Sequence, residues 1–211
     1  MSKPSGQWRH RADCRLVYKA PRGDIRAVDR LTLSVPMITD ALMPTLVEIV
    51  PYDPKWPDDF LASEALLRDV LGGCVGAVEH IGSTAVPGLA AKPIIDVDVV
   101  SGIGDIPNAS AALIDAGFEP RGNRYDDDVW AFLLKRLSPQ IRVYLCPPSN
   151  QTHERRMLFR NYLRQHDDRA LAYSTLKRHL AEQFPYDGDR YTSEKSAFIS
   201  AIVCAAQKDM G

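Results

Sequence analysis

The chain has 211 residues, of which 45% are hydrophobic and 25% charged, and its net charge is −1 at neutral pH. This size and composition predict one folded domain with a substantial core. There is no basic excess of the kind that a nucleic-acid partner requires, and no apolar run approaches the roughly 20 residues of a membrane span. The four cysteines lack metal-ligand or disulfide spacing, so we expect reduced thiols in a cytoplasmic protein.

The first 42 residues differ from the rest of the chain. Their basic residues follow no apolar period, and prolines and a glycine interrupt the elements that could form there. Acidic residues argue against a transit peptide, and a signal-peptide apolar core is missing from this stretch. We therefore expect residues 1–42 to be a disordered tail or an over-extended N-terminus, and residues 43–211 to be the folded domain.

The folded part begins with a predicted strand, helix and strand. Residues 46–50 are apolar and end at a proline, which suits a short strand. Pro57 and the acids after it mark the start of a helix, and its apolar face runs to Gly72, where the helix ends. Residues 77–81 form the next predicted strand and carry His80. We expect a packed, hydrogen-bonded histidine there, with a catalytic role left open.

A turn follows at Gly82, Ser83 and Thr84. Glycine lets the backbone approach a phosphate closely, and the two hydroxyl groups are hydrogen-bond donors. A short helix starting near Ser83 would aim free N–H groups at an anion. An ordinary tight turn uses the same residues, so the turn alone does not decide between the two interpretations.

The strongest local pattern is the strand predicted for residues 94–100, which is rich in β-branched residues and follows a proline. Because side chains alternate along a strand, Asp96 and Asp98 share one face and lie roughly 7 Å apart. Two carboxylates so placed repel each other, and a divalent cation such as Mg²⁺ offsets the repulsion. The spacing leaves a solvated polar face and a metal site equally open, and the preceding turn favours the site.

The rest of the chain is predicted to add one helix, further strands and a helical C-terminal part. The helix covers residues 107–116, and three amphipathic helices follow from residue 152 onward. A hairpin at residues 138–140 joins the last two strand segments. These elements together predict an α+β domain. The strand segments are residues 118–121, 129–137 and 141–145.

Around the turn and the carboxylate strand, the chain resembles a known family. The runs HIGSTAVPGL at residues 80–89 and AKPIIDVDV at residues 91–99 are similar to the signature of the GrpB family, a group within the nucleotidyltransferase superfamily. The resemblance extends over residues 45–205, approximately. It implies a nucleotidyltransferase-like mixed β-sheet with flanking helices and a C-terminal helical segment. Similar domains are fused to dephospho-CoA kinase in some bacteria.

The resemblance also implies roles for individual residues. Asp96 and Asp98 match the catalytic, metal-binding pair, with Mg²⁺ as the cofactor, and the turn matches a phosphate-binding segment. Basic side chains would hold a triphosphate or another polyanion. The residues implied in nucleotide or phosphate binding are Gly82, Ser83, Thr84, Lys92, Arg142, Arg160, Arg164, Lys177 and Lys195.

A third carboxylate, which complete nucleotidyltransferases carry on a later strand, is not found at the matching place. Similar chains tend to have a histidine in that strand, whereas this chain has Arg142. An arginine cannot act as a base but can bind a phosphate. The run Asp126-Asp127-Asp128 is an alternative acidic source, although a solvated loop is the favoured interpretation of it.

Two functions are therefore open. The leading hypothesis is a Mg²⁺-dependent nucleotide-binding protein that transfers a nucleotidyl group to a small molecule. The alternative is a non-catalytic module that binds a nucleotide or a CoA-like polyanion. A third acidic side chain near Asp96 and Asp98 favours the enzyme, and Arg142 in that place favours the binder. In both cases the expected partner is a phosphorylated small molecule, and neither a membrane nor a nucleic acid.

Overall fold

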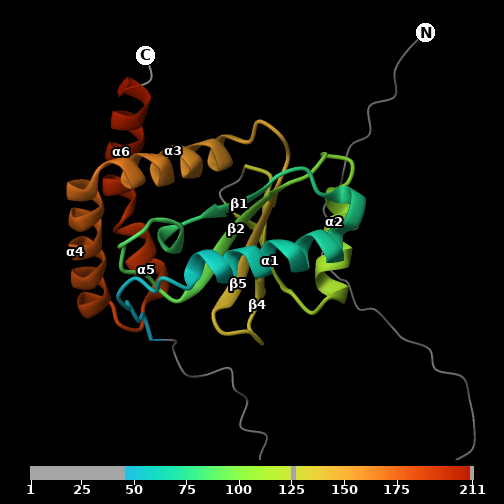
Figure 1. Ribbon diagram of the computed structural model, residues 1–211, viewed down its shortest axis with the longest axis horizontal. Helices are drawn as coiled ribbons and strands as arrows, with labels where there is room; N and C mark the ends of the chain where they lie inside the picture. Colours follow the sequence, from blue (N-terminus) through green and yellow to red (C-terminus); the bar gives the residue numbers. More distant parts are fainter. Residues whose placement is uncertain (1–45, 125–126, 210–211) are drawn as a thin grey trace, which may run out of the picture. The chain divides into compact units, whose positions relative to one another are not determined.

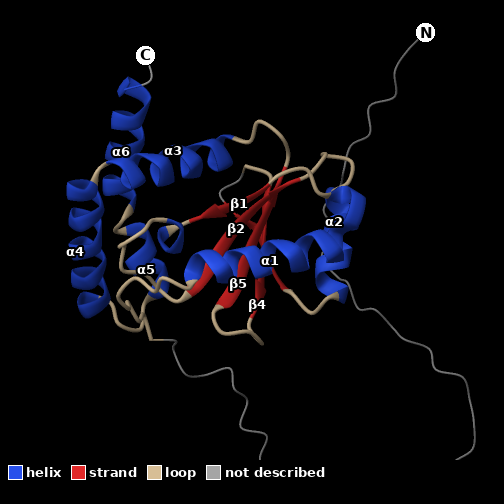
Figure 2. Ribbon diagram, in the orientation of Figure 1, coloured by secondary structure: helices blue, strands red, loops and turns tan. Residues whose placement is uncertain are grey.

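The computed structural model describes residues 46–124 and 127–209. The expectations for residues 1–42 and for Asp126 therefore concern parts of the chain outside the described residues. Figures 1 and 2 show a β-sheet with helices around it. The strands are β1 (Val78–Ile81), β2 (Ile94–Val100), β3 (Glu119–Arg124), β4 (Val129–Leu134) and β5 (Gln140–Cys146). The helices are α1 (Trp56–Leu71), α2 (Ile106–Asp115), α3 (Gln151–Gln165), α4 (Asp167–Gln183), α5 (Gly188–Ser193) and α6 (Ser196–Asp209).

The five strands form one mixed sheet in the order β1-β2-β5-β4-β3. Strand β2 runs parallel to β5, whereas the β1–β2, β3–β4 and β4–β5 pairs are antiparallel. The predicted hairpin between the last two strands is thus confirmed, and so is the α+β fold class. The parallel pairing matters for function because it places the predicted carboxylate strand directly beside the strand that carries Arg142.

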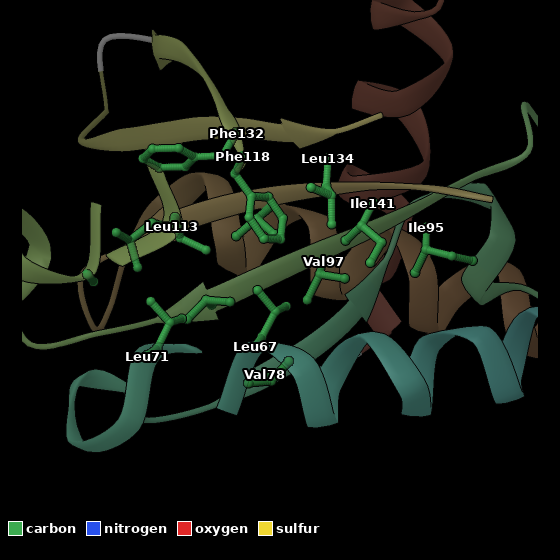
Figure 3. Packing of buried hydrophobic residues seen from close by; sticks show 14 of the residues in the cluster. Leu67, Leu71, Val78, Ile95, Val97, Leu113, Phe118, Phe132, Leu134 and Ile141 are labelled. Atoms are coloured by element: carbon green, nitrogen blue, oxygen red, sulfur yellow. The ribbon is translucent and has the colours of Figure 1, made fainter. Parts of the chain in front are cut away.

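One face of the sheet is apolar and forms the main core. Ile95, Val97 and Val99 of β2 point to this face and are fully buried. They pack with Leu67 of α1 and Leu113 of α2 (Figure 3). Burying an aliphatic side chain of this size contributes about 1.5–3 kcal/mol relative to leaving it exposed, so this layer is a main source of stability. The alternation predicted for residues 94–100 is confirmed.

The C-terminal helices form a second apolar cluster. Phe159 of α3, Tyr173 of α4 and Ile202 of α6 meet there with Val86 and Leu89, from the segment between the turn and β2. Tyr173 packs edge-on against the ring of Phe159 with ring centres 5.1 Å apart. The segment that follows the glycine-serine turn is therefore held against the C-terminal helices, and both parts contribute to the same region of the molecule.

Two expectations about the elements are wrong. Residues 46–50 do not form a strand: Val50 alone makes an antiparallel bridge, to Ala91, while the N–H of Val47 donates to the carbonyl of Pro185. The segment thus diverges from the sheet towards the end of α4. The part after residue 152 contains a short extra helix, α5, which has too few residues to show an apolar period. Among the described residues, no helix is long and apolar enough to cross a membrane.

Candidate functional site

The two predicted carboxylates lie on the same face of β2 but in different surroundings. The side chain of Asp96 is 21% exposed and borders a cavity. Asp98 is fully buried. The face opposite the main core is therefore polar along β2, as the alternation predicted, although its carboxylates are not both open to solvent.

Asp98 is held by two side chains of α3. Nη1 of Arg156 donates to Oδ1 of Asp98 over 2.6 Å, and Nδ1 of His153 lies 2.9 Å from Oδ2. The guanidinium of Arg156 also stacks on the ring of Tyr144, 3.9 Å from its centre. A buried carboxylate needs such partners because desolvation of the charge is otherwise very costly. Asp98 thus anchors α3 to the sheet.

The start of α3 is fixed by side-chain caps. The Oδ1 atom of Asn150 accepts from the N–H of His153, as expected for an N-cap residue. Oδ2 of Asp127 accepts from both the N–H and the hydroxyl of Thr152, and these bonds lower the pKa of Asp127. Asp127 is therefore a helix cap, and its neighbour Asp128 is exposed. Within the described residues, neither of them joins Asp96 and Asp98 in a group that could hold a metal ion.

Asp96 is paired with an arginine from the neighbouring strand. The parallel register places Arg142 of β5 directly opposite Asp96, and Nη1 of Arg142 lies 3.2 Å from Oδ1 of Asp96. Burial raises the pKa of Asp96, whereas Arg142 and, more weakly, Arg156 lower it. The position at which the resemblance led us to look for a third carboxylate thus carries a positive charge.

Gly82 lies against Asp96. Its φ is +72°, a backbone conformation that favours glycine, and a Cβ atom placed there would lie 2.7 Å from Oδ2 of Asp96. Ser83 to Ala85 form only a three-residue 3₁₀ helix. A glycine is therefore needed here because the carboxylate of Asp96 lies against the backbone. The sequence had suggested that a phosphate would take this place.

The histidine beside the turn is structural. The ring of His80 stacks on Phe60, with ring centres 4.6 Å apart, and its Nε2 lies 3.0 Å from Oγ1 of Thr84. The hydroxyl of Thr84 also donates to the carbonyl of Ile94. Burial, with Arg164 and Arg160 nearby, lowers the pKa of His80 to about 4. The predicted packed, hydrogen-bonded histidine is confirmed: its ring ties the turn to β1, and the hydroxyl of Thr84 ties the turn to β2.

A cavity of about 470 Å³ opens in front of Asp96. It lies between the polar face of the sheet, the turn and the C-terminal helices. Small-molecule sites usually have volumes of about 300–1,000 Å³. Most of the predicted site residues line this cavity: Ser83, Thr84, Lys92, Asp96, Arg142, Lys177 and Lys195. Residues that the sequence reasoning did not propose for the site also line it, among them Arg121, Tyr144, Asp189, Tyr191 and Thr192.

Three lysines gather at one part of this cavity. The ammonium groups of Lys92 and Lys195 lie 4.6 and 4.1 Å from the ring centre of Tyr191. Lys177 is buried and donates to the carbonyl of Ala90. Burial, with the neighbouring lysine and arginine charges, lowers the pKa of Lys177 to about 7 and that of Lys195 to about 8. Burial and Arg142 likewise lower the pKa of Lys92.

Two predicted phosphate-binding residues have other partners. Arg160 donates to Oε2 of Glu79 over 3.0 Å and to the carbonyl of His80 over 2.7 Å. Arg164 donates to the carbonyl of Ala85 over 2.8 Å. Neither lines the cavity. Arg160 is thus bound to β1 and Arg164 to the turn, so both hold the elements that carry the site without lining the cavity.

The comparisons with known proteins give the family. The model of the GrpB protein family matches residues 46–204. The chain belongs to the GrpB family. A crystal structure of GrpB from Enterococcus faecalis has 33% sequence identity and a TM-score of 0.70, and the match covers 77% of this chain and 99% of that one. The predicted family is thus confirmed.

Two curated relatives of this GrpB-family chain carry the name UPF0157 protein. UPF0157 protein PA4798 of Pseudomonas aeruginosa is 33% identical over 74% of this chain and 66% of its own length. UPF0157 protein YqkA of Bacillus subtilis is 34% identical over 72% of this chain and 45% of its own length. The chain therefore spans less than two thirds of the length of these relatives.

The donor atoms around this GrpB cavity do not fit Mg²⁺. Both oxygens of Asp98 are engaged by α3, and Asp96 is paired with Arg142. Within residues 46–124 and 127–209, no group of three or more His, Cys, Asp or Glu side chains is arranged to hold a metal ion. A hard divalent cation takes oxygen ligands and would here share the site with guanidinium and ammonium groups.

We expect Gly82→Ala to destabilise the protein by about 1–3 kcal/mol, because alanine is strained at this φ and its Cβ meets Asp96. Urea denaturation measures the loss. Gly88→Ala is the matched control, since Gly88 has a φ of +75° but a Cβ placed there would meet nothing within 4 Å. Equal losses of stability in the two variants would contradict the contact with Asp96. So would a loss in Gly82→Ala that is not reduced when Asp96→Ala is added to the same chain.

Proposed function

We propose that this GrpB-family protein binds a phosphorylated small molecule, with nucleotides as the first candidates, in the cavity in front of Asp96. The observation that carries the proposal is the excess of cationic side chains there. Lys92, Lys177 and Lys195 line the cavity together with two arginines, against the carboxylates of Asp96 and Asp189. Such an excess repels itself until an anion enters.

Among the described residues, none of the three lysines makes an ion pair with a carboxylate within 4.0 Å. Lys177 is buried and already donates to the carbonyl of Ala90, so Lys92 and Lys195 are the more accessible two. Phosphate oxygens accept charge-assisted hydrogen bonds from ammonium groups, each worth about 1.5–3 kcal/mol. Ser83 adds a hydroxyl at the wall of the cavity that belongs to the turn. The cavity thus offers a phosphate group both positive charges and hydrogen-bond donors.

Isothermal titration of the full chain with ATP, GTP, CTP, UTP and dephospho-CoA, with and without Mg²⁺, tests this function. We expect at least one of these compounds to bind, and Lys195→Met to weaken binding about tenfold or more by removing one charged contact. Because burial disfavours its ammonium, Lys195→Met should leave the fold intact.

Lys208→Met is the matched control, because Lys208 is exposed on the last turn of α6, away from the cavity lining. Its affinity should equal that of the wild type. Equal weakening by the two substitutions would mean that general charge rather than the cavity attracts the ligand. If none of the panel binds, the function proposed here is wrong for nucleotides and dephospho-CoA.

Nucleotidyl transfer is the second candidate. The observation in its favour is that Asp96 borders the cavity close to Ser83, so a carboxylate and a phosphate-binding hydroxyl face the same space. Transfer of the nucleotidyl group from a bound nucleoside triphosphate to a hydroxyl of an added small molecule, with release of pyrophosphate and with loss of both in Asp96→Asn, is the result that would support it. Binding without such release would leave the non-catalytic module as the function.

A further inference from the structure

We propose that the cavity holds its ligand without a divalent metal, because arginine and lysine side chains occupy the place and supply the charge that a metal ion would. This inference rests on the proposed function and narrows it to phosphorylated compounds that bind in their metal-free form. Three features of the described residues support it. Asp98 is buried and bound by α3, Asp96 forms an ion pair with Arg142, and the ammonium groups of two lysines lie over the ring of Tyr191.

Asp98 is not available to a cation in the cavity. Its side chain is fully buried, and His153 and Arg156 take up both of its oxygens. To reach the cavity, Asp98 would have to leave these partners, and α3 would lose its attachment to β2. A change of this kind leaves a buried charge without a counterion, which is strongly unfavourable.

Asp96 already has a cation beside it. The parallel register of β2 and β5 places Arg142 directly opposite Asp96 on the same face of the sheet. The ion pair of 3.2 Å between them is only partly exposed. A metal ion at Asp96 would have to displace this guanidinium into a cavity that is already positively charged.

Apart from Asp98, the charges of described residues that shift the pKa of Asp96 are positive. The ammonium groups of Lys92 and Lys195 lie over the ring of Tyr191, and Asp96 acts on the pKa of both lysines through its charge. Like charges within a few ångströms raise the free energy of a bound divalent cation. The same charges favour a bare phosphate group, which can take hydrogen bonds from both lysines.

The ligand class follows from this arrangement. Triphosphates in a magnesium-containing solution exist mainly as metal complexes, whereas monophosphate esters bind Mg²⁺ weakly. A cavity that recognises the uncomplexed phosphate therefore favours monophosphate esters, such as a nucleoside monophosphate, over a magnesium triphosphate. Added Mg²⁺ should weaken the binding of triphosphates and leave that of monophosphates unchanged.

The direct test is titration of the full chain with Mn²⁺, followed by electron paramagnetic resonance. The wild type should show no bound Mn²⁺ at millimolar concentrations. Arg142→Asp places a second carboxylate opposite Asp96 and should create a Mn²⁺ site. Arg142→Gln, which removes the same charge without adding a carboxylate, should not, and Asp96→Asn should abolish the site in the Arg142→Asp chain.

The outcomes separate the two proposals. A Mn²⁺ ion that binds the wild type and is lost in Asp96→Asn would overturn the metal-free inference, as would a nucleotide that binds only with Mg²⁺, although the proposed function would then stand. If the wild type binds neither Mn²⁺ nor any phosphate ester, the proposed function fails and the ligand class fails with it. Should Arg142→Asp fold poorly, the wild-type titrations still decide, since they need no variant.

Discussion

Asp98→Asn is expected to lower the free energy of unfolding by about 3–5 kcal/mol, because it removes the fully buried negative charge that pairs with the largely buried guanidinium of Arg156. Arg156 would stay at the interface of α3 and β2, with its strongest acceptor reduced to a neutral amide. For a protein of this size the loss corresponds to a fall in Tm of about 6–20 °C. Urea and thermal unfolding measure it.

A double-mutant cycle isolates the pair. We expect Arg156→Met and Asp98→Asn each to be strongly destabilising, and the double variant to be less so than the sum, with a coupling energy of about 1–3 kcal/mol. Asp115→Asn, at the exposed end of α2, is the control and should change stability by less than about 0.5 kcal/mol. Additive effects of the two substitutions would show that Asp98 and Arg156 do not act as a pair.

The affinity for a phosphorylated ligand is expected to fall steeply as the pH rises from 6.5 to 9. The pKa of Lys177 is lowered to about 7 and that of Lys195 to about 8, so both lysines lose their charge over this range in the empty protein. A ligand that requires a lysine to be charged must then bind together with a proton. Affinity falls by up to about tenfold per pH unit for each such proton.

The direction in which affinity changes with pH shows whether the lysines or the phosphate ester titrate. The second ionisation of a phosphate ester, with a pKa of about 6, strengthens binding as the pH rises, which is the opposite direction. Lys195→Arg keeps its charge at every pH tested and should flatten the profile. A wild-type profile that is flat or rises up to pH 9 would contradict a role for these lysines. The groups around them are Lys92, Asp96, Arg142, Tyr173, Arg178 and Tyr191.

The same shifts predict how the stability of the empty protein depends on pH. Both lysines bind protons less readily in the folded than in the unfolded state, whose lysines have a pKa of about 10.4. Between about pH 7 and pH 10 the unfolded state therefore binds more protons, and stability rises with pH. Urea denaturation of the ligand-free protein at several pH values measures this rise in stability.

Much of the fold could be predicted because its signals are local. The alternation along β2 separated the apolar face from Asp96 and Asp98, and glycine and proline marked where the helices begin and end. The segment at residues 46–50 looked like a strand for the same reason, since a short apolar run cannot show whether it has a partner. The short helix α5 was missed because six residues carry no period.

The partners in the site could not be predicted because they depend on contacts between distant segments. The sequence did not single out His153 or Arg156 as site residues, although both contact a carboxylate more than fifty residues away in the sequence. Arg160 resembled a phosphate ligand by its charge, but its partners are Glu79 and a backbone carbonyl. Charge alone does not reveal which face of a helix meets the sheet.

The segment between the turn and β2 is irregular, yet both backbone polar groups of one residue there are bound by α4. The N–H of Ala90 donates to the hydroxyl of Ser174, and its carbonyl accepts from Lys177. The next residue, Ala91, exchanges two backbone bonds with Val50. The groups that are bound at Ala90 and Ala91 are main-chain atoms, whereas Val86 and Leu89 earlier in the segment are held by packing in the second apolar cluster. The path of the chain at Ala90 is thus specified by side chains of a helix more than eighty residues later, through bonds that do not involve the alanine side chain.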